Sequence, residues 1–123
     1  MLDAVVATTT SNDFYVGNCE RIALLITCAA HSAGNGAFTF AGGLSSDKAT
    51  TAPTTVALSL ITTNAANTNG QTILRTTGAT LSANGSSLLW LNLKEFPVEF
   101  INATVTRTTD GTYSCWLMKV TKE

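Results

Sequence analysis

The sequence predicts an all-β fold, a single-domain β-sandwich or jelly roll of about eight strands with a short N-terminal arm. Short runs of β-branched and aromatic residues recur along the chain, and turns rich in Gly, Asn, Ser and Asp separate them. No segment combines the periodicity of an amphipathic helix with helix end signals. The length of 123 residues suits one domain with one core. These runs are therefore expected to form two packed sheets.

The first division of the chain is predicted at residue 12. Residues 1–12 are expected to form an extended arm outside the sandwich, where Val5 and Val6 are suited to adding a strand to a sheet edge. Residues 13–123 are expected to form the sandwich domain. Its first strand is predicted over residues 14–16, and the Gly-Asn pair that follows ends it.

A long strand is predicted over residues 20–30. Its larger apolar side chains alternate at period two on one face, and the opposite face is smaller but hardly polar. The two faces carry Ile22, Leu24, Ile26 and Cys28 on one side and Ala23, Leu25, Thr27 and Ala29 on the other. A strand that is apolar on both faces is typically central in its sheet.

Three shorter strands are predicted in the middle of the chain. Residues 37–41 and 56–60 each alternate between larger apolar and smaller side chains, and residues 72–77 form a short β-branched run. Polar loops are predicted over residues 45–53 and over residues 62–70, the second of which is rich in Thr, Asn and Ala.

Two Gly-containing dipeptides predict tight hairpins in the C-terminal half. Asn84-Gly85 is expected to pair residues 80–82 with residues 87–93. Asp110-Gly111 is expected to pair the preceding run with residues 113–121.

The run over residues 97–108 changes its apolar phase near its start. Val98 and Phe100 share one parity, whereas Ile101 and the apolar residues after it share the other. A β-bulge or a change of sheet near Phe100 is predicted from this slip.

The charge content excludes several classes of function. Charged residues make up 12% of the chain, about half the usual share. The 7 basic and 8 acidic residues give a formal net charge of −1, so no nucleic-acid partner is expected. The chain start lacks the features of a secretory signal, and the longest apolar run is far shorter than the roughly 20 residues that span a bilayer. No membrane partner is therefore expected.

Cys19, Cys28 and Cys115 are an odd number of cysteines without the spacing of a metal site. Cys28 and Cys115 lie inside apolar runs, where a free cysteine behaves as a small hydrophobic residue. We expect all three to be reduced and mostly buried in a protein made in a cytosol. A disulfide between Cys115 and either Cys19 or Cys28 remains an alternative if the mature assembly meets oxidising conditions.

Residues suited to catalysis are few. His31 is the single histidine of the chain and is predicted to lie in a loop after a strand end, and the chain has no Gly-x-Ser-x-Gly sequence. Glu95 and Glu99 flank a Phe-Pro pair, and carboxylates beside turn signals are typically solvated. We therefore expect a protein that is not an enzyme and has no catalytic, cofactor-binding or metal-binding residues.

The last predicted strand is apolar on both faces, so one face is expected in the core and the other against a neighbouring subunit. The candidate interface residues are Val5, Val6, Trp90, Trp116 and Met118. Because so few charges are available to solvate a free monomer, we expect the chain to work in an oligomer or on a larger protein lattice. Trp90, Tyr113 and Trp116 also suit a sugar-stacking platform, so a carbohydrate-binding module is an alternative.

Three segments share a layout with a known class of protein. Residues 12–27 form a short strand, a Gly turn and a long apolar strand, and the segments 37–44 and 110–113 continue the pattern. This layout resembles the small all-β virion proteins of tailed bacteriophages, in particular head decoration or cement proteins.

The resemblance implies a non-enzymatic β-sandwich, often trimeric, that binds between major capsid protein subunits and stabilises the head. Its place would be the capsid surface of a virion assembled in the host cytoplasm. A strand-exchanging tail, pilus or filament subunit that polymerises through residues 1–12 is a further alternative.

Overall fold

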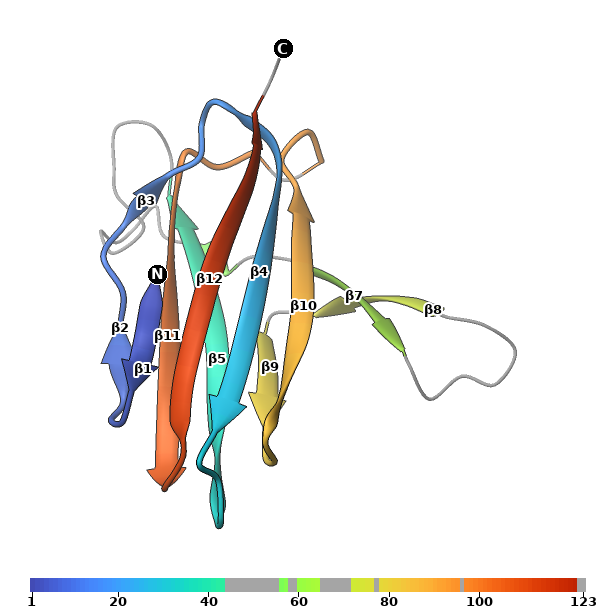
Figure 1. The fold of residues 1–123 in the computed structure, drawn as a ribbon. Helices are drawn as coiled ribbons and strands as arrows, with labels where there is room; N and C mark the ends of the chain where they lie inside the picture. The colour runs from blue at the N-terminus through green and yellow to red at the C-terminus, as the bar shows by residue number, and fades with distance from the viewer. Residues whose placement is uncertain (44–55, 58–59, 65–71, 77, 96, 122–123) are drawn as a thin grey trace.

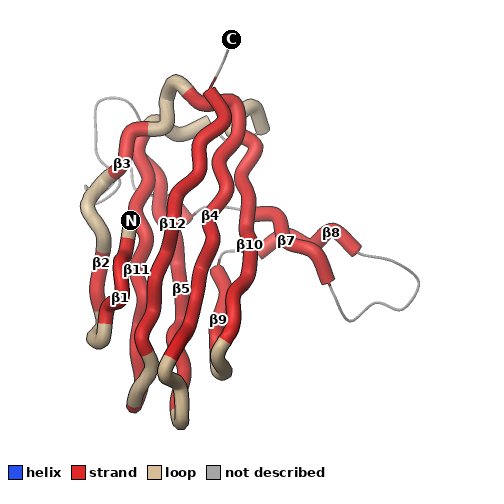
Figure 2. Tube along the Cα trace, in the orientation of Figure 1, coloured by secondary structure: helices blue, strands red, loops and turns tan. Residues whose placement is uncertain are grey.

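The structure is a computed structural model that describes residues 1–43, 56–57, 60–64, 72–76, 78–95 and 97–121. Two antiparallel sheets pack face to face, and the described residues contain no helix (Figures 1 and 2). The predicted β-sandwich is therefore confirmed. The described strands number twelve and not about eight, because several short strands of two to five residues join the sheet edges.

We call the two layers the front sheet and the back sheet, after their positions in Figure 1. The front sheet has the order β1 (Leu2–Val5), β12 (Thr112–Thr121), β4 (Cys19–Ala29), β10 (Gly85–Asn92), β7 (Leu60–Asn64) and β8 (Thr72–Thr76). The back sheet has the order β2 (Thr9–Thr10), β11 (Phe100–Thr109), β5 (Gly34–Gly43) and β6 (Val56–Ala57). In addition, β3 (Phe14–Tyr15) pairs with β11, and β9 (Gly78–Leu81) pairs with β5.

The core lies between the inner faces of the two sheets. The front sheet contributes Ile22, Leu24 and Ile26 from β4 and Leu89 and Leu91 from β10, and the back sheet contributes Phe38, Phe40, Ile101, Ala103 and Val105. Strand β4 is central, with β12 on one side and β10 on the other, as its two apolar faces predict. Cys19, Cys28 and Cys115 are free and buried, also as predicted.

Both predicted hairpins are wrong, because each Gly-containing turn joins strands of different sheets. Strand β9 pairs with β5 in the back sheet, whereas β10, after Asn84-Gly85, pairs with β4 in the front sheet. Likewise β11 lies in the back sheet and β12, after Asp110-Gly111, lies in the front sheet. The positive φ of Gly85 and Gly111 lets the chain cross between layers at the lower end of Figure 1.

Of the two alternatives predicted near Phe100, the β-bulge is wrong, and a change of sheet does not occur within β11, which lies in the back sheet throughout. Strand β11 pairs with β5 in continuous register from the pair Phe100 and Gly43 to the pair Thr109 and Gly34. The apolar phase changes because Val98 lies before the strand and is buried there independently of the strand's alternation.

The middle of the chain agrees with the prediction in part. Strand β8 falls within the predicted segment 72–77. The strand predicted over 56–60 is divided, since β6 lies in the back sheet and β7 begins at residue 60 in the front sheet. Strand β7 also extends to Asn64, into the predicted loop. The remaining predicted loop residues, 45–53 and 65–70, lie outside the described residues.

Residues 1–12 belong to the sandwich in this structure, in contrast to the arm expected outside it. Strand β1 forms the edge of the front sheet, and β2 lies along β11 in the back sheet. The apolar side chain of Leu2 explains the difference, because it is buried in the core opposite Cys115. The amide of Ala4, whose φ is 49°, donates a hydrogen bond to Ser114 Oγ at 2.9 Å and lies where the register with β12 shifts between Leu2 and Val5.

Candidate functional site

The outer face of the front sheet carries a continuous set of apolar side chains from three adjacent strands, five of which are exposed and two half-buried. Register places Leu88 of β10, Leu25 of β4 and Trp116 of β12 in one cross-strand row. A second row contains Trp90, Ala23 and Met118, and Val120 lies beyond Met118 on β12. We call these seven residues the apolar face.

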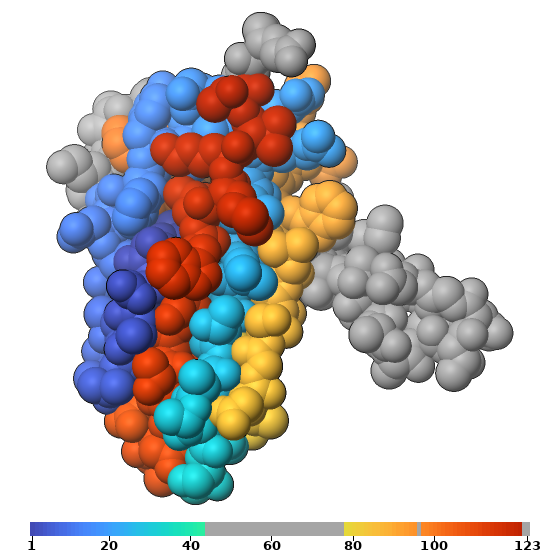
Figure 3. Space-filling model, in the orientation of Figure 1, coloured from blue at the N-terminus to red at the C-terminus, as the bar shows by residue number. Residues whose placement is uncertain are grey.

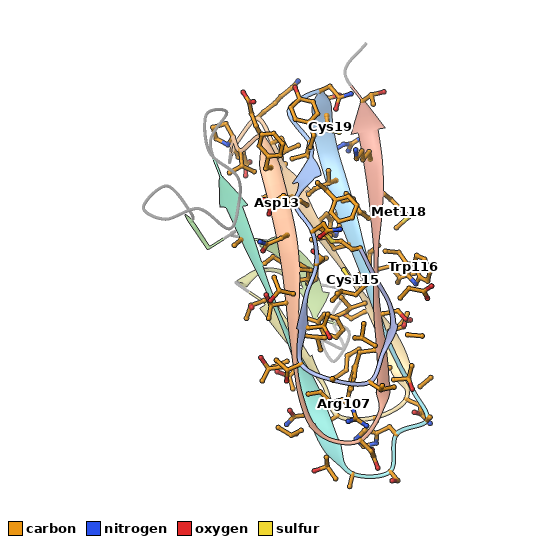
Figure 4. The ribbon with its side chains drawn as sticks, turned by 90° about the vertical axis from the view of Figure 1, so that its left-hand side faces the viewer. Asp13, Cys19, Arg107, Cys115, Trp116 and Met118 are labelled. Carbon is orange, nitrogen blue, oxygen red and sulfur yellow. The ribbon has the colours of Figure 1, made fainter. Side chains whose placement is uncertain are left out.

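The strand periodicity explains how this face forms. In β12, Tyr113 and Cys115 are fully buried between the sheets, so Trp116, Met118 and Val120 must point outward. Figure 4 shows Trp116 and Met118 directed away from the sandwich and Cys115 directed into it. The front view in Figure 3 shows the surface that β12, β4 and β10 share.

The exposure of these side chains is large for their type. The exposed fraction is 42% for Trp90, 45% for Trp116 and 47% for Met118, and Leu88 and Val120 have similar values. Single exposed apolar residues are normal on soluble proteins, but a contiguous apolar patch marks an interaction site. One face of the last strand is in the core, as predicted, and the other face is exposed; the contact of that exposed face with a neighbouring subunit stays a prediction.

Charged groups lie at the margin of the apolar face. Arg21 of β4 is opposite Val120 and exposed, at the end of the face. The ammonium group of Lys94 forms an ion pair with Glu20 at 2.8 Å, in the turn after β10. The ammonium group of Lys119 donates to the Tyr15 carbonyl at 2.9 Å and so lies toward the edge of the sandwich. Between these groups the face is neutral.

The structure brings together three of the five candidate interface residues. Trp90, Trp116 and Met118 share the apolar face. Val5 lies instead on β1, where it is half-buried opposite Tyr113, and Val6 is 60% exposed after that strand. The sequence reasoning did not select Leu25 and Leu88, although the alternation within their strands contains the signal.

The predicted platform of three aromatic residues does not form. Tyr113 is fully buried, and its ring meets Phe38 edge-on with a centroid distance of 6.0 Å. Trp90 and Trp116 stay exposed on strands that flank β4, in different cross-strand rows. A sugar-stacking surface would therefore lack one of its three members.

A polar cluster is the second feature considered as a site. It lies at the lower end of Figure 1, where the β4–β5, β9–β10 and β11–β12 connections meet. Asp110 Oδ1 accepts hydrogen bonds from the amides of Ser32 and Ala33 at 3.0 and 3.1 Å, and the Ser32 hydroxyl donates to Asp110 Oδ2. These bonds, that of the Ser32 hydroxyl first, lower the pKa of Asp110 to about 2. The amide of His31 donates to Asn84 Oδ1 at 2.9 Å, which ties in the third connection.

This cluster is built to join loops and lacks the arrangement of a nucleophilic centre. His31 Nε2 lies 2.7 Å from the Gly34 carbonyl, and the Ser32 hydroxyl is bonded directly to the carboxylate, so the imidazole does not stand between them. Glu95 is exposed in a turn, and Glu99 is half-buried just before β11. Within the described ranges, no group of three or more His, Cys, Asp and Glu side chains could hold a metal ion.

The described part of the chain contains no helix long and apolar enough to cross a membrane. Comparisons of the sequence with protein family models and with curated proteins, and of the fold with solved structures, find no match. The apolar face is therefore the feature from which a function must be argued.

Proposed function

We propose that the chain is a non-enzymatic structural protein of a virion, a capsid decoration or cement protein that attaches to major capsid protein subunits through its apolar face. The observation that carries this proposal is the cluster of exposed Trp90, Trp116 and Met118 side chains on one sheet face. The resemblance in layout to small phage head proteins is the reason for proposing a capsid as the assembly to which the chain attaches.

The chemistry of the face suits attachment to protein. Tryptophan is enriched among the residues that dominate binding energy at protein interfaces, and two tryptophans lie on this face. The face is neutral between Arg21 and the Glu20–Lys94 ion pair, so covering it leaves no charge buried without a partner. Burying it would release about 25 cal/mol for each Å² of apolar surface removed from water.

A capsid lattice adds a further argument. A contact of modest affinity on each copy is sufficient when many copies bind a repeating surface, because binding that favours the assembled state stabilises that state by mass action. The low charge of the chain, 7 basic and 8 acidic residues, also weakens repulsion between neighbouring copies on such a lattice.

Two alternatives have less support. A strand-exchanging filament subunit would need β1 to leave its own sheet, where Leu2 is buried opposite Cys115. A carbohydrate module would use Trp90 and Trp116 without Tyr113, which is in the core.

The test begins with native particles. An antibody raised against the purified chain should detect it in the density-gradient fraction that contains capsids, and intact particles should bind that antibody on their surface. Absence of the chain from purified capsids would contradict the proposal.

Rebinding then tests the face. Capsids depleted of the protein should bind the Trp90→Lys and Trp116→Lys variants at least about tenfold more weakly than the unchanged chain, because each variant puts a charge into an apolar contact. Thr39→Lys is the matched control, since Thr39 is exposed on the outer face of the back sheet. Equal losses for all three variants would contradict attachment through the apolar face.

A further inference from the structure

Among the described residues, β1 covers less than half of the outer edge of β12. Strand β1 pairs with β12 through Leu2 and Val5, which lie opposite Cys115 and Tyr113. Among the described residues, no strand pairs with residues 116–121 of β12 on that side. Figure 1 shows β1 beside the lower part of β12 and the upper part extending past it. An open edge presents unpaired backbone groups to which another strand can add.

The same stretch of β12 supplies three of the five exposed apolar side chains of the face. Trp116, Met118 and Val120 are 45%, 47% and 46% exposed, and all three lie beyond the part that β1 covers. An open edge and an apolar face therefore coincide on one five-residue segment. A strand that adds at this edge would satisfy the backbone and also cover part of these side chains.

We propose that this edge pairs with the same edge of a second copy, with the two β12 strands antiparallel about a two-fold axis at Met118. The front sheets of the two copies then form one continuous sheet. A two-fold interface uses the same surface on both partners, so each residue must be compatible with its own image.

The register follows from the strand itself. Residues directly opposite each other in an antiparallel pair lie on the same face of the sheet, so a symmetric pair must be centred on a residue and not between two residues. Centring on Lys119 would place two ammonium groups opposite each other, which is unfavourable. Centring on Leu117 would use only residues 116–118 of the open edge before reaching the part that β1 occupies. Centring on Met118 uses residues 116–120.

On the outer face, the Met118 register gives complementary side-chain pairs. Trp116 of each copy lies opposite Val120 of the other, so a large side chain meets a small one, and Met118 meets its own image. The apolar faces of the two copies become neighbours on one side of the continuous sheet. Leu88 and Trp90, on the far side of β4, stay uncovered. The inference rests on the proposed function only in that this doubled face would be the one that attaches to the capsid.

The size of the contact sets the expected affinity. One pair of five-residue strands with three apolar side chains per copy is smaller than the roughly 1,600 Å² of a standard protein interface. We therefore expect a dimer that dissociates at about micromolar concentrations or above. Attachment of both copies to one lattice would strengthen it.

The experiment uses the symmetry of the pair. The full chain is studied by sedimentation equilibrium from about 1 to about 500 μM, a range that spans weak association. The unchanged chain should reach a dimer. Met118→Lys and Met118→Glu should each weaken dimerisation by about tenfold or more, because each places like charges opposite each other. An equimolar mixture of the two variants should dimerise again, since opposite charges then face each other.

Leu88→Lys is the matched control, because Leu88 lies on the same face with a similar exposed fraction of 44% but away from the edge. It should dimerise like the unchanged chain. Circular dichroism and thermal unfolding establish that each variant is folded, and Met118 is exposed, so its substitution spares the core.

The outcomes separate this inference from the proposed function. A chain that stays monomeric, forms a trimer, or dimerises equally well as Met118→Lys overturns the β12 pairing, as does a mixture of charge variants that fails to recover. Capsid binding is measured separately in the rebinding assay. Loss of binding in Leu88→Lys with an intact dimer supports both ideas, and a normal dimer that never binds capsids contradicts only the proposed function.

Discussion

Substitution of Gly36 by alanine should destabilise the fold strongly, although it adds only one methyl group. An added Cβ at Gly36 would lie 2.3 Å from Tyr113 Cε1 and 2.6 Å from Cδ1. The Tyr113 ring cannot easily move away, because its hydroxyl donates to the Asp110 carbonyl at 3.2 Å and its edge contacts Phe38. Gly111 contacts the opposite edge of the Tyr113 ring, because a Cβ added at Gly111 would lie 2.8 Å from the Tyr113 hydroxyl and 2.9 Å from Cε2.

The magnitude follows from two opposing terms. Overpacking a buried site by a methyl group costs about 1–3 kcal/mol, and a contact more than 1 Å too short belongs at the upper end. Replacing glycine by alanine also restricts the unfolded chain, which stabilises the folded state by about 0.4–1 kcal/mol. The net loss in the free energy of unfolding should be about 2 kcal/mol, which lowers the Tm by roughly 8 °C in a domain of this length.

Chemical denaturation and thermal unfolding measure this loss, and a double-mutant cycle tests its cause. Tyr113→Leu removes the ring that Gly36→Ala would strike. The double variant should therefore be more stable than the sum of the single effects by about 1–2 kcal/mol. Thr39→Ala, an exposed substitution on the same strand, should change stability by less than about 0.5 kcal/mol. An unchanged Tm in Gly36→Ala, or strict additivity in the cycle, would refute the reasoning.

Three further predictions concern the polar cluster, a strained turn and a buried thiol. The folded-state pKa of Asp110 is lowered to about 2, below its unfolded value, so its stabilising contribution is complete above about pH 4 and is lost as pH falls toward 2. The difference in Tm between the unchanged chain and Asp110→Asn should therefore shrink in that window; a constant difference would contradict the role of the charge. Thr109 has a φ of 68°, which a β-branched residue disfavours, so Thr109→Asn should raise the free energy of unfolding by about 0.5–1 kcal/mol. Burial raises the pKa of the Cys115 thiol to about 12, so a thiol reagent should label it only under denaturing conditions, and fast labelling of the native chain would show that β1 leaves its place.

The sequence predicted the fold class and the faces of the strands better than it predicted their connections. Period-two alternation is a local property, so the buried side of β4 could be assigned from Ile22, Leu24 and Ile26 alone. A Gly-containing turn is also local, but the sheet that the next strand joins depends on distant partners. Asp110-Gly111 has the composition of a hairpin turn, yet β12 finds its partner in β4, about ninety residues earlier in the chain.

The candidate site was predicted in part for the same reason. Alternation placed Trp116 and Met118 on one side of β12, and the structure keeps them there. The meeting of that strand with β10 across β4 is a matter of sheet order, which no local pattern contains. Val5 was selected as an interface candidate on an arm that could add to a sheet edge, but β1 already forms the edge of the chain's own front sheet, where the buried Leu2 holds it.

The low charge of the chain does not require both broad faces to be covered by protein. The outer face of the back sheet carries Thr39 and Thr104 in one row, with Thr106 on the next row, and Thr10 Oγ1 lies 2.9 Å from Thr104 Oγ1. Hydroxyl groups form hydrogen bonds with water without carrying charge, so this face can stay exposed to solvent with little loss of free energy. The apolar face has no such groups in its two central rows. The low charge content therefore leaves only the outer face of the front sheet poorly solvated. A partner that covers this face is sufficient, and the threonine-rich outer face of the back sheet can stay in solvent.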